Sequence, residues 1–159
     1  MNVEQLMMKG TRTCCPEESL NDAAQIMWEG DCGCVPVVSG KGETKLLGVI
    51  TDRDICMAAY TQGKTLGEMP VHSAMAHRVF TCSPDDTIAA AEQIMREARV
   101  RRLPVVDESG QLLGLISLAD IAREAAREQE SKNKLVTHSE IGETLSAICE
   151  PRCGEVVVT

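Results

Sequence analysis

The sequence is poor in aromatic residues and in positive charge. It has one Trp, one Tyr and one Phe among 159 residues, and 16 Lys and Arg stand against 24 Asp and Glu, for a net charge of −8. Binding to DNA or RNA needs a basic face for the phosphates, and single strands also need aromatic side chains on which bases stack. We therefore exclude nucleic acid as a main partner.

Long apolar runs and export signals are also missing. No apolar stretch approaches the ~20 residues of a membrane-spanning helix. The N-terminus lacks the basic start followed by an apolar stretch that marks a secretion signal. We expect a cytoplasmic protein that does not enter a membrane.

Motifs for catalysis are missing as well. The sequence has no P-loop, no Ser-His-Asp order and no cluster of histidines. Its histidines are isolated, at His72, His77 and His138. We expect no enzyme activity, no catalytic residue and no required cofactor.

Cysteine, in contrast, is abundant, with eight residues. In the cytoplasm these thiols are reduced, and in a strand a cysteine acts as a small buried apolar residue. No CxxC occurs, and the spacings present match zinc sites poorly, so we expect no metal site. A thiol or metal redox sensor stays open as an alternative; it would use Cys32, Cys34, Cys149 or Cys153.

The most informative feature is an internal repeat. Residues 3–38 and 71–106 are identical at 13 of 36 positions with a constant offset of 68. Residues 46–55 and 112–121 are identical at 6 of 10 positions with an offset of 66. A unit of about 65 residues has a marginal core on its own, so we expect the two copies to share buried surface.

Each copy predicts the same elements in the same order. A short leading segment (residues 3–7 and 71–75) precedes a short strand, a helix, two strands of a hairpin and a second helix. Ser19 and Thr87 are expected to cap the first helices. The short strands are expected at 12–15 and 79–83, and the hairpins at 35–38 with 46–50 and at 103–106 with 112–116.

The repeats divide the chain into four parts. We assign residues 3–63 to the first repeat, 64–70 to a linker, 71–130 to the second repeat and 131–159 to a tail. Within the tail, Ile141, Leu145 and Ile148 share one face of a predicted helix. Residues 155–159 could form an edge strand. The tail could pack on its own chain, stay disordered or bind a partner.

One motif occurs once in each copy: Gly48-x-x-Thr51-x-x-Asp54 and Gly114-x-x-Ser117-x-x-Asp120. A hydroxyl followed three residues later by a carboxylate is also a helix capping box. A cap, however, requires neither the preceding glycine nor the matching strand. A hydroxyl at a helix N-terminus suits a phosphate, and a carboxylate can accept hydrogen bonds from both hydroxyls of a ribose. Together they predict a nucleotide site.

These motifs, with the Pro-Val-Val strands, resemble a tandem pair of CBS domains, called a Bateman module. The resemblance implies an α+β fold in which two modules, small sheets packed with helices, are related by pseudo-twofold symmetry and leave clefts between them. Members bind adenosyl compounds such as AMP, ADP, ATP or S-adenosylmethionine as regulatory ligands, commonly form flat homodimers and act on a protein target, which is unknown here. A ligand-free module for dimerisation or interaction is a further alternative.

The resemblance also implies roles for particular residues. Asp54 and Asp120 would hold the ribose, and Thr51 and Ser117 would meet phosphate or ribose oxygens. Thr13 and Thr81, with the neighbouring strand residues, would line the base pocket. The apolar residues Val35, Val37, Leu103 and Val105 would contact adenine. At least one nearby arginine would reach a phosphate: Arg53, Arg99, Arg101 or Arg102.

The two copies differ before the Pro-Val-Val strand. Cys32-Gly33-Cys34 occupies the positions of Val100-Arg101-Arg102 in the second copy. We expect the first cleft to lack a cation that the second has, so one site should bind its ligand more tightly.

Overall fold

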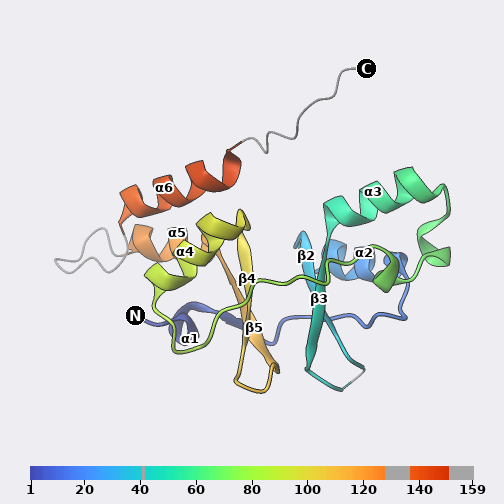
Figure 1. The fold of residues 1–159 in the computed structure, drawn as a ribbon, viewed down its shortest axis with the longest axis horizontal. Helices are drawn as coiled ribbons and strands as arrows, with labels where there is room; N and C mark the ends of the chain where they lie inside the picture. The colour runs from blue at the N-terminus through green and yellow to red at the C-terminus, as the bar shows by residue number, and fades with distance from the viewer. Residues whose placement is uncertain (41, 128–136, 151–159) are drawn as a thin grey trace.

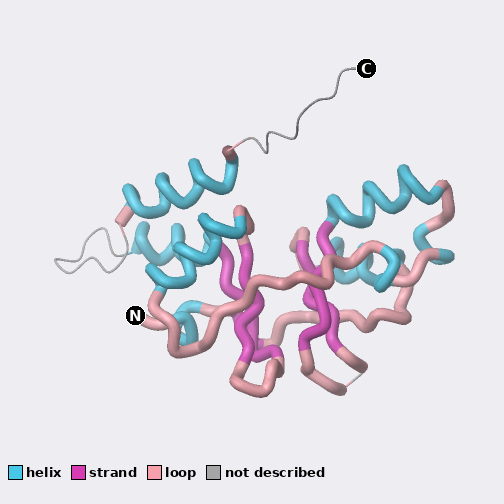
Figure 2. The backbone as a smooth tube through the Cα atoms, viewed as in Figure 1, coloured by secondary structure: helices cyan, strands magenta, loops and turns pink. Residues whose placement is uncertain are grey.

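The fold consists of two similar lobes that lie side by side (Figure 1). It is taken from a computed structural model, which describes residues 1–40, 42–127 and 137–150. In each lobe a β-hairpin lies toward the middle of the molecule and the helices lie outside it (Figure 2). This arrangement is the predicted α+β fold with one lobe for each repeat.

The first lobe follows the predicted order of elements. Ser19 caps its first helix, because its side chain accepts a hydrogen bond from the backbone N–H of Asp22. The two strands are antiparallel, with Val35 opposite Ile50. Gly63 ends the last helix in the left-handed conformation, at a φ of 63°. The elements are α2 (Leu20–Glu29), β2 (Cys34–Val38), β3 (Leu46–Thr51) and α3 (Asp52–Gln62).

The second lobe repeats this plan. Thr87 caps the first helix through the N–H of Ala90, and the strands pair with Leu103 opposite Ile116. At the end of that helix Arg99 adopts the left-handed conformation, with a φ of 53°. The elements are α4 (Ile88–Ala98), β4 (Arg102–Val106), β5 (Leu112–Ser117) and α5 (Leu118–Arg127).

The short strands predicted at 12–15 and 79–83 are wrong as strands. Each segment makes only one parallel bridge, Cys14 with Val37 and Cys82 with Val105. Pro16 and Pro84 follow closely, and a proline has no N–H with which to extend a ladder. Each segment is therefore an extended loop in which the bridging cysteine is buried.

The leading segments are exchanged between the lobes. Helix α1 (Val3–Leu6) and strand β1 (Met8–Lys9) lie against the second lobe, where β1 pairs with β5 and Val3 is buried in the core (Figure 1). In return, Val71 of the 3₁₀ turn η2 (Val71–Ser73) is buried in the core of the first lobe. Each core thus needs residues from both repeats.

The motif glycines make this exchange possible. A Cβ atom on Gly48 would lie 2.7 Å from the carbonyl oxygen of Ala76, and one on Gly114 would lie 2.6 Å from that of Met8. Only glycine lets the exchanged segment approach so closely. The glycine that a helix cap does not require is therefore explained by packing.

Residues 64–70 connect the lobes and also pack. They contain the 3₁₀ turn η1 (Leu66–Glu68), which contacts α2. Met69 is fully buried in the core of the first lobe.

The predicted helix of the tail is confirmed as α6 (His138–Cys149), which packs on α4 and α5 (Figure 1). Ile141 and Ile148 contact the core of the second lobe, whereas Leu145 stays 46% exposed. The buried hydroxyl of Thr144 accepts a hydrogen bond from Arg96 at 3.1 Å and lies 3.4 Å from a carboxylate oxygen of buried Glu92.

The remaining prediction for the tail, an edge strand at 155–159, lies outside the described residues. Within the described ranges, no helix is long and apolar enough to cross a membrane.

Candidate ligand-binding cleft

A cavity of about 410 Å³ lies between the lobes. The first lobe contributes Cys34 from β2 and the end of β3, with Thr51 and Asp54. The second lobe contributes Arg101 and Arg102 at the start of β4. A molecule in this cavity would touch both lobes at once.

The backbone between the lobes completes the cavity. The segment after η2 pairs with β3, because Val49 and Ala76 exchange two backbone hydrogen bonds of 3.1 and 2.8 Å. It then carries Arg78 and Phe80 along the wall. The guanidinium of Arg78 lies 5.3 Å from the centre of the Phe80 ring, which is a cation–π distance.

Thr51 and Asp54 form a capping box at the start of α3. One carboxylate oxygen of Asp54, Oδ2, accepts hydrogen bonds from the backbone N–H of Thr51 at 2.9 Å and from its hydroxyl at 2.6 Å. The N–H of Asp54 in turn donates to the hydroxyl oxygen at 3.3 Å. Among the described residues, no hydrogen bond reaches the other oxygen, Oδ1. The cap therefore fixes the carboxylate and leaves one oxygen available to a ligand.

The electrostatics of the cavity favour an anion next to a neutral polar group. Arg78, Arg101 and Arg102 line it together with the single carboxylate of Asp54. Guanidinium groups match phosphate oxygens, and a carboxylate accepts hydrogen bonds from hydroxyl groups. The arrangement can bind a phosphorylated sugar.

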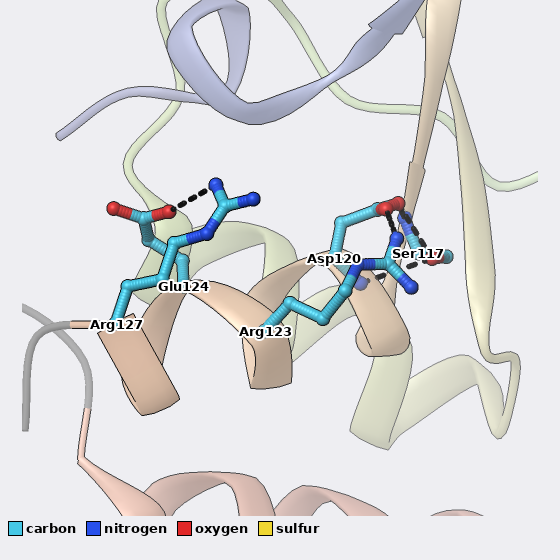
Figure 3. A network of polar contacts seen from close by, with 5 residues as sticks. All are labelled: Ser117, Asp120, Arg123, Glu124 and Arg127. Carbon is cyan, nitrogen blue, oxygen red and sulfur yellow. Dashed lines mark hydrogen bonds and ion pairs between the residues drawn. The ribbon is translucent and has the colours of Figure 1, made fainter.

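The second motif forms the same cap but is closed by a further contact. Oδ2 of Asp120 accepts hydrogen bonds from the N–H and the hydroxyl of Ser117, at 2.9 and 2.5 Å. Arg123, one turn further along α5, forms an ion pair with Oδ1 (Figure 3). Both oxygens of Asp120 therefore have partners.

Four of the predicted residues lie together in the cleft: Thr51, Asp54, Arg101 and Arg102. Other predicted residues lie elsewhere. Ser117 lines a second cavity of about 300 Å³ beside α6, which Arg101 and Arg102 also line. Thr81 lines a cavity near the hairpin loops. Arg99 forms an ion pair of 2.8 Å with Glu150, Arg53 is exposed, and Thr13 is half-buried.

The apolar residues expected to contact adenine are inside the cores. The side chains of Val35, Val37, Leu103 and Val105 are fully buried. Successive residues of a strand point to opposite faces, so the alternate positions of the strands meet the cleft. These are Cys34, Arg102 and Pro104.

Arg101 and Arg102 line cavities at both motifs. They line the cleft with Thr51 and Asp54, because this cleft is built from both lobes. They also line the cavity that contains Ser117, the motif of their own repeat. Phe80 is one of the strand residues beside Thr81 that were expected to line the base pocket, whereas Arg78 was not predicted.

Three of the cysteines, Cys14, Cys34 and Cys82, are buried. Burial raises the pKa of Cys34 to about 11 and those of Cys14 and Cys82 to about 12. These thiols are therefore protonated at neutral pH. Among the same residues, no three His, Cys, Asp or Glu side chains are placed to hold a metal ion. Cys153 lies outside the described ranges.

Comparison with known proteins identifies relatives over both repeats. The model of the CBS domain family matches residues 3–60 and 71–127. The CBS domain-containing protein YhcV of Bacillus subtilis is 32% identical over 121 residues, which are 76% of this chain and 83% of YhcV.

Two solved structures show the same fold. The CBS domain pair of protein MJ0100, in complex with 5-methylthioadenosine and S-adenosyl-L-methionine, is 25% identical with a TM-score of 0.72 and covers 81% of this chain and 98% of its own. Hypoxic Response Protein I, with two coordinated zinc ions, is 29% identical with a TM-score of 0.69 and covers 77% and 98%.

Proposed function

This chain belongs to the CBS-domain family, and we propose that it is a regulatory module that binds an adenosyl ligand in the cleft between its lobes. The observation that carries this proposal is Oδ1 of Asp54, to which no described residue donates a hydrogen bond. A capping box holds this carboxylate in a cavity of about 410 Å³ that Arg101 and Arg102 also line. We propose a binding role and no catalytic one.

Each part of such a ligand has a counterpart in the cleft. The ribose hydroxyls would donate to Oδ1 of Asp54, and each hydrogen bond to a charged group is worth about 1.5–3 kcal/mol. The phosphate would meet the arginines, and the base would lie along Phe80 and the β2 and β4 residues of the wall. The complex of MJ0100 with two adenosyl compounds supports this ligand class.

The route of signalling follows from the origin of these groups. The carboxylate belongs to the first lobe and Arg101 and Arg102 belong to the second, so a bound ligand would fix the lobes relative to each other. A protein target that contacts both lobes, or α6, would respond to this change.

We also propose a homodimer, formed through the outer face of α2 and α3. These helices expose 88% of Trp28 and 82% of Tyr60. The corresponding helices of the second lobe, α4 and α5, are covered by α6 (Figure 1). Trp28 occupies the position that Arg96 has in the second repeat, and Arg96 donates a hydrogen bond to Thr144 of α6. The outer face of α2 and α3 therefore lacks the polar contact that holds α6 on the second lobe. A second copy would cover it instead.

Thermal unfolding tests the ligand proposal. Nucleotide-free protein should be compared alone and with AMP, ATP, S-adenosylmethionine and, as a control, GTP. A ligand at 100 times its dissociation constant adds about 2.7 kcal/mol to the free energy of unfolding, which raises Tm by roughly 5–10 °C in a chain of this size. We expect this shift with an adenosyl compound and its loss in Asp54→Ala, with Asp120→Ala as the matched control.

The second candidate function is a ligand-free interaction module, which the exposed Trp28 and Tyr60 favour. It predicts no shift in Tm with any of these compounds.

A further inference from the structure

The two copies of the motif differ at one contact. In both, the cap occupies Oδ2 of the aspartate, but Arg123 binds Oδ1 of Asp120 whereas no described residue binds Oδ1 of Asp54. We infer that Arg123 closes the second motif to nucleotide, so that this chain binds one nucleotide, at Asp54. This inference rests on the proposed function.

The contact depends on a single position of the repeat. Arg123 lies three residues after Asp120 on α5, so the two side chains share one face of the helix. In α3 the position three residues after Asp54 is Met57, which cannot pair with a carboxylate. Met57 is 46% exposed, so its side chain is not required to fill the core.

The ion pair removes what a ribose needs. A sugar hydroxyl requires an accessible carboxylate oxygen, and Ser117 and Arg123 together occupy both oxygens of Asp120 (Figure 3). Only 15% of the Asp120 side chain is exposed, which leaves little room for a ligand beside Arg123. Losing one hydrogen bond to a charged group, at about 1.5 kcal/mol, weakens binding about tenfold.

The cations differ only in part. The positions that match Arg78, Arg101 and Arg102 in the first repeat are Gly10, Gly33 and Cys34, so at these positions the first lobe offers the second motif no cation. Arg101 and Arg102 themselves line the cavity that contains Ser117. The ion pair of Arg123 with Asp120 is therefore the contact that separates the two motifs.

Exchanging the two residues tests the inference. Wild type, Met57→Arg, Arg123→Met and Arg127→Met should each be titrated in a calorimeter with AMP, ATP and S-adenosylmethionine separately. Arg127→Met is the matched control, because it removes the neighbouring 3.4 Å ion pair with Glu124 on the same helix (Figure 3). A thermal melt of each variant checks that it is folded.

Wild type and Arg127→Met should each bind one equivalent of nucleotide per chain. Met57→Arg should bind nucleotide at least about tenfold more weakly, and Arg123→Met should bind a second equivalent with lower affinity. Two equal sites in wild type, unchanged binding in folded Met57→Arg, or a single equivalent in folded Arg123→Met would overturn the inference and leave the proposed function standing. No binding of any probe to nucleotide-free wild type would refute the proposed function itself.

Discussion

Replacing Gly48 by alanine should destabilise the protein by an amount that the geometry bounds. The new methyl carbon would lie 2.7 Å from the carbonyl oxygen of Ala76, whereas ordinary contact begins near 3.4 Å. The exchanged segment must therefore retreat by several tenths of an ångström. The same carbonyl accepts the 3.1 Å hydrogen bond from Val49, and its residue donates one of 2.8 Å in return.

Two costs add up. Overpacking costs about 1–3 kcal/mol, and weakening one or two neutral hydrogen bonds costs about 0.5–1.5 kcal/mol each. We expect a loss of about 2–4 kcal/mol from a total stability of about 5–15 kcal/mol. This loss lowers Tm by roughly 5–15 °C.

Urea unfolding followed by circular dichroism measures the loss. Gly114→Ala should behave like Gly48→Ala, because its methyl would lie 2.6 Å from the carbonyl oxygen of Met8. Gly67→Ala is the control, since nothing lies within 4 Å of its Cβ position, and it should change stability by less than about 0.5 kcal/mol. A free energy of unfolding for Gly48→Ala within that same margin of wild type would refute the exchange of segments as described.

Three further outcomes are expected. Trp28→Glu should convert the proposed dimer into a folded monomer, measured by light scattering. Leu113→Glu, which changes another exposed apolar residue, should leave the dimer intact. If Trp28→Glu were still a dimer, the α2–α3 face would be excluded as the interface. Burial raises the pKa of Glu92, so the folded state favours its protonated form and stability falls as pH rises above 4.5. Glu92→Gln should stabilise the protein at pH 7 and match wild type near pH 4 in urea titrations; equal stability at both pH values would contradict this. At pH 8 iodoacetamide should modify exposed Cys56 and leave buried Cys34, whose pKa is about 11, unmodified. If Cys34 reacted as fast as Cys56, the thiol sensor would be favoured.

Local features of the fold could be predicted from the sequence. The caps at Ser19 and Thr87, the two hairpins and α6 depend on residues close in sequence, and all are confirmed. The capping geometry of Thr51 and Asp54 was likewise visible, because hydroxyl and carboxylate are three residues apart.

Features that join the two repeats could not be predicted. The position of Arg102 opposite Asp54 depends on how the lobes pack, and a sequence repeat does not record which copy faces which cleft. The close approach of Ala76 to Gly48 also depends on how the lobes pack, so from the sequence alone the glycine indicates a binding motif and not a packing contact. Side chains alternate between the two faces of a strand, but the sequence does not say which face is buried until the position of the core is known. For this reason the burial of Val35 in the core could not be predicted.

The most direct test of the central claim is calorimetric titration of nucleotide-free Asp54→Ala and Asp120→Ala, beside wild type, with the adenosyl compound that raises Tm most. We predict that Asp54→Ala loses binding and that Asp120→Ala binds one equivalent with the affinity of wild type. Undiminished binding by folded Asp54→Ala, or loss of binding in Asp120→Ala alone, would contradict the assignment of the site.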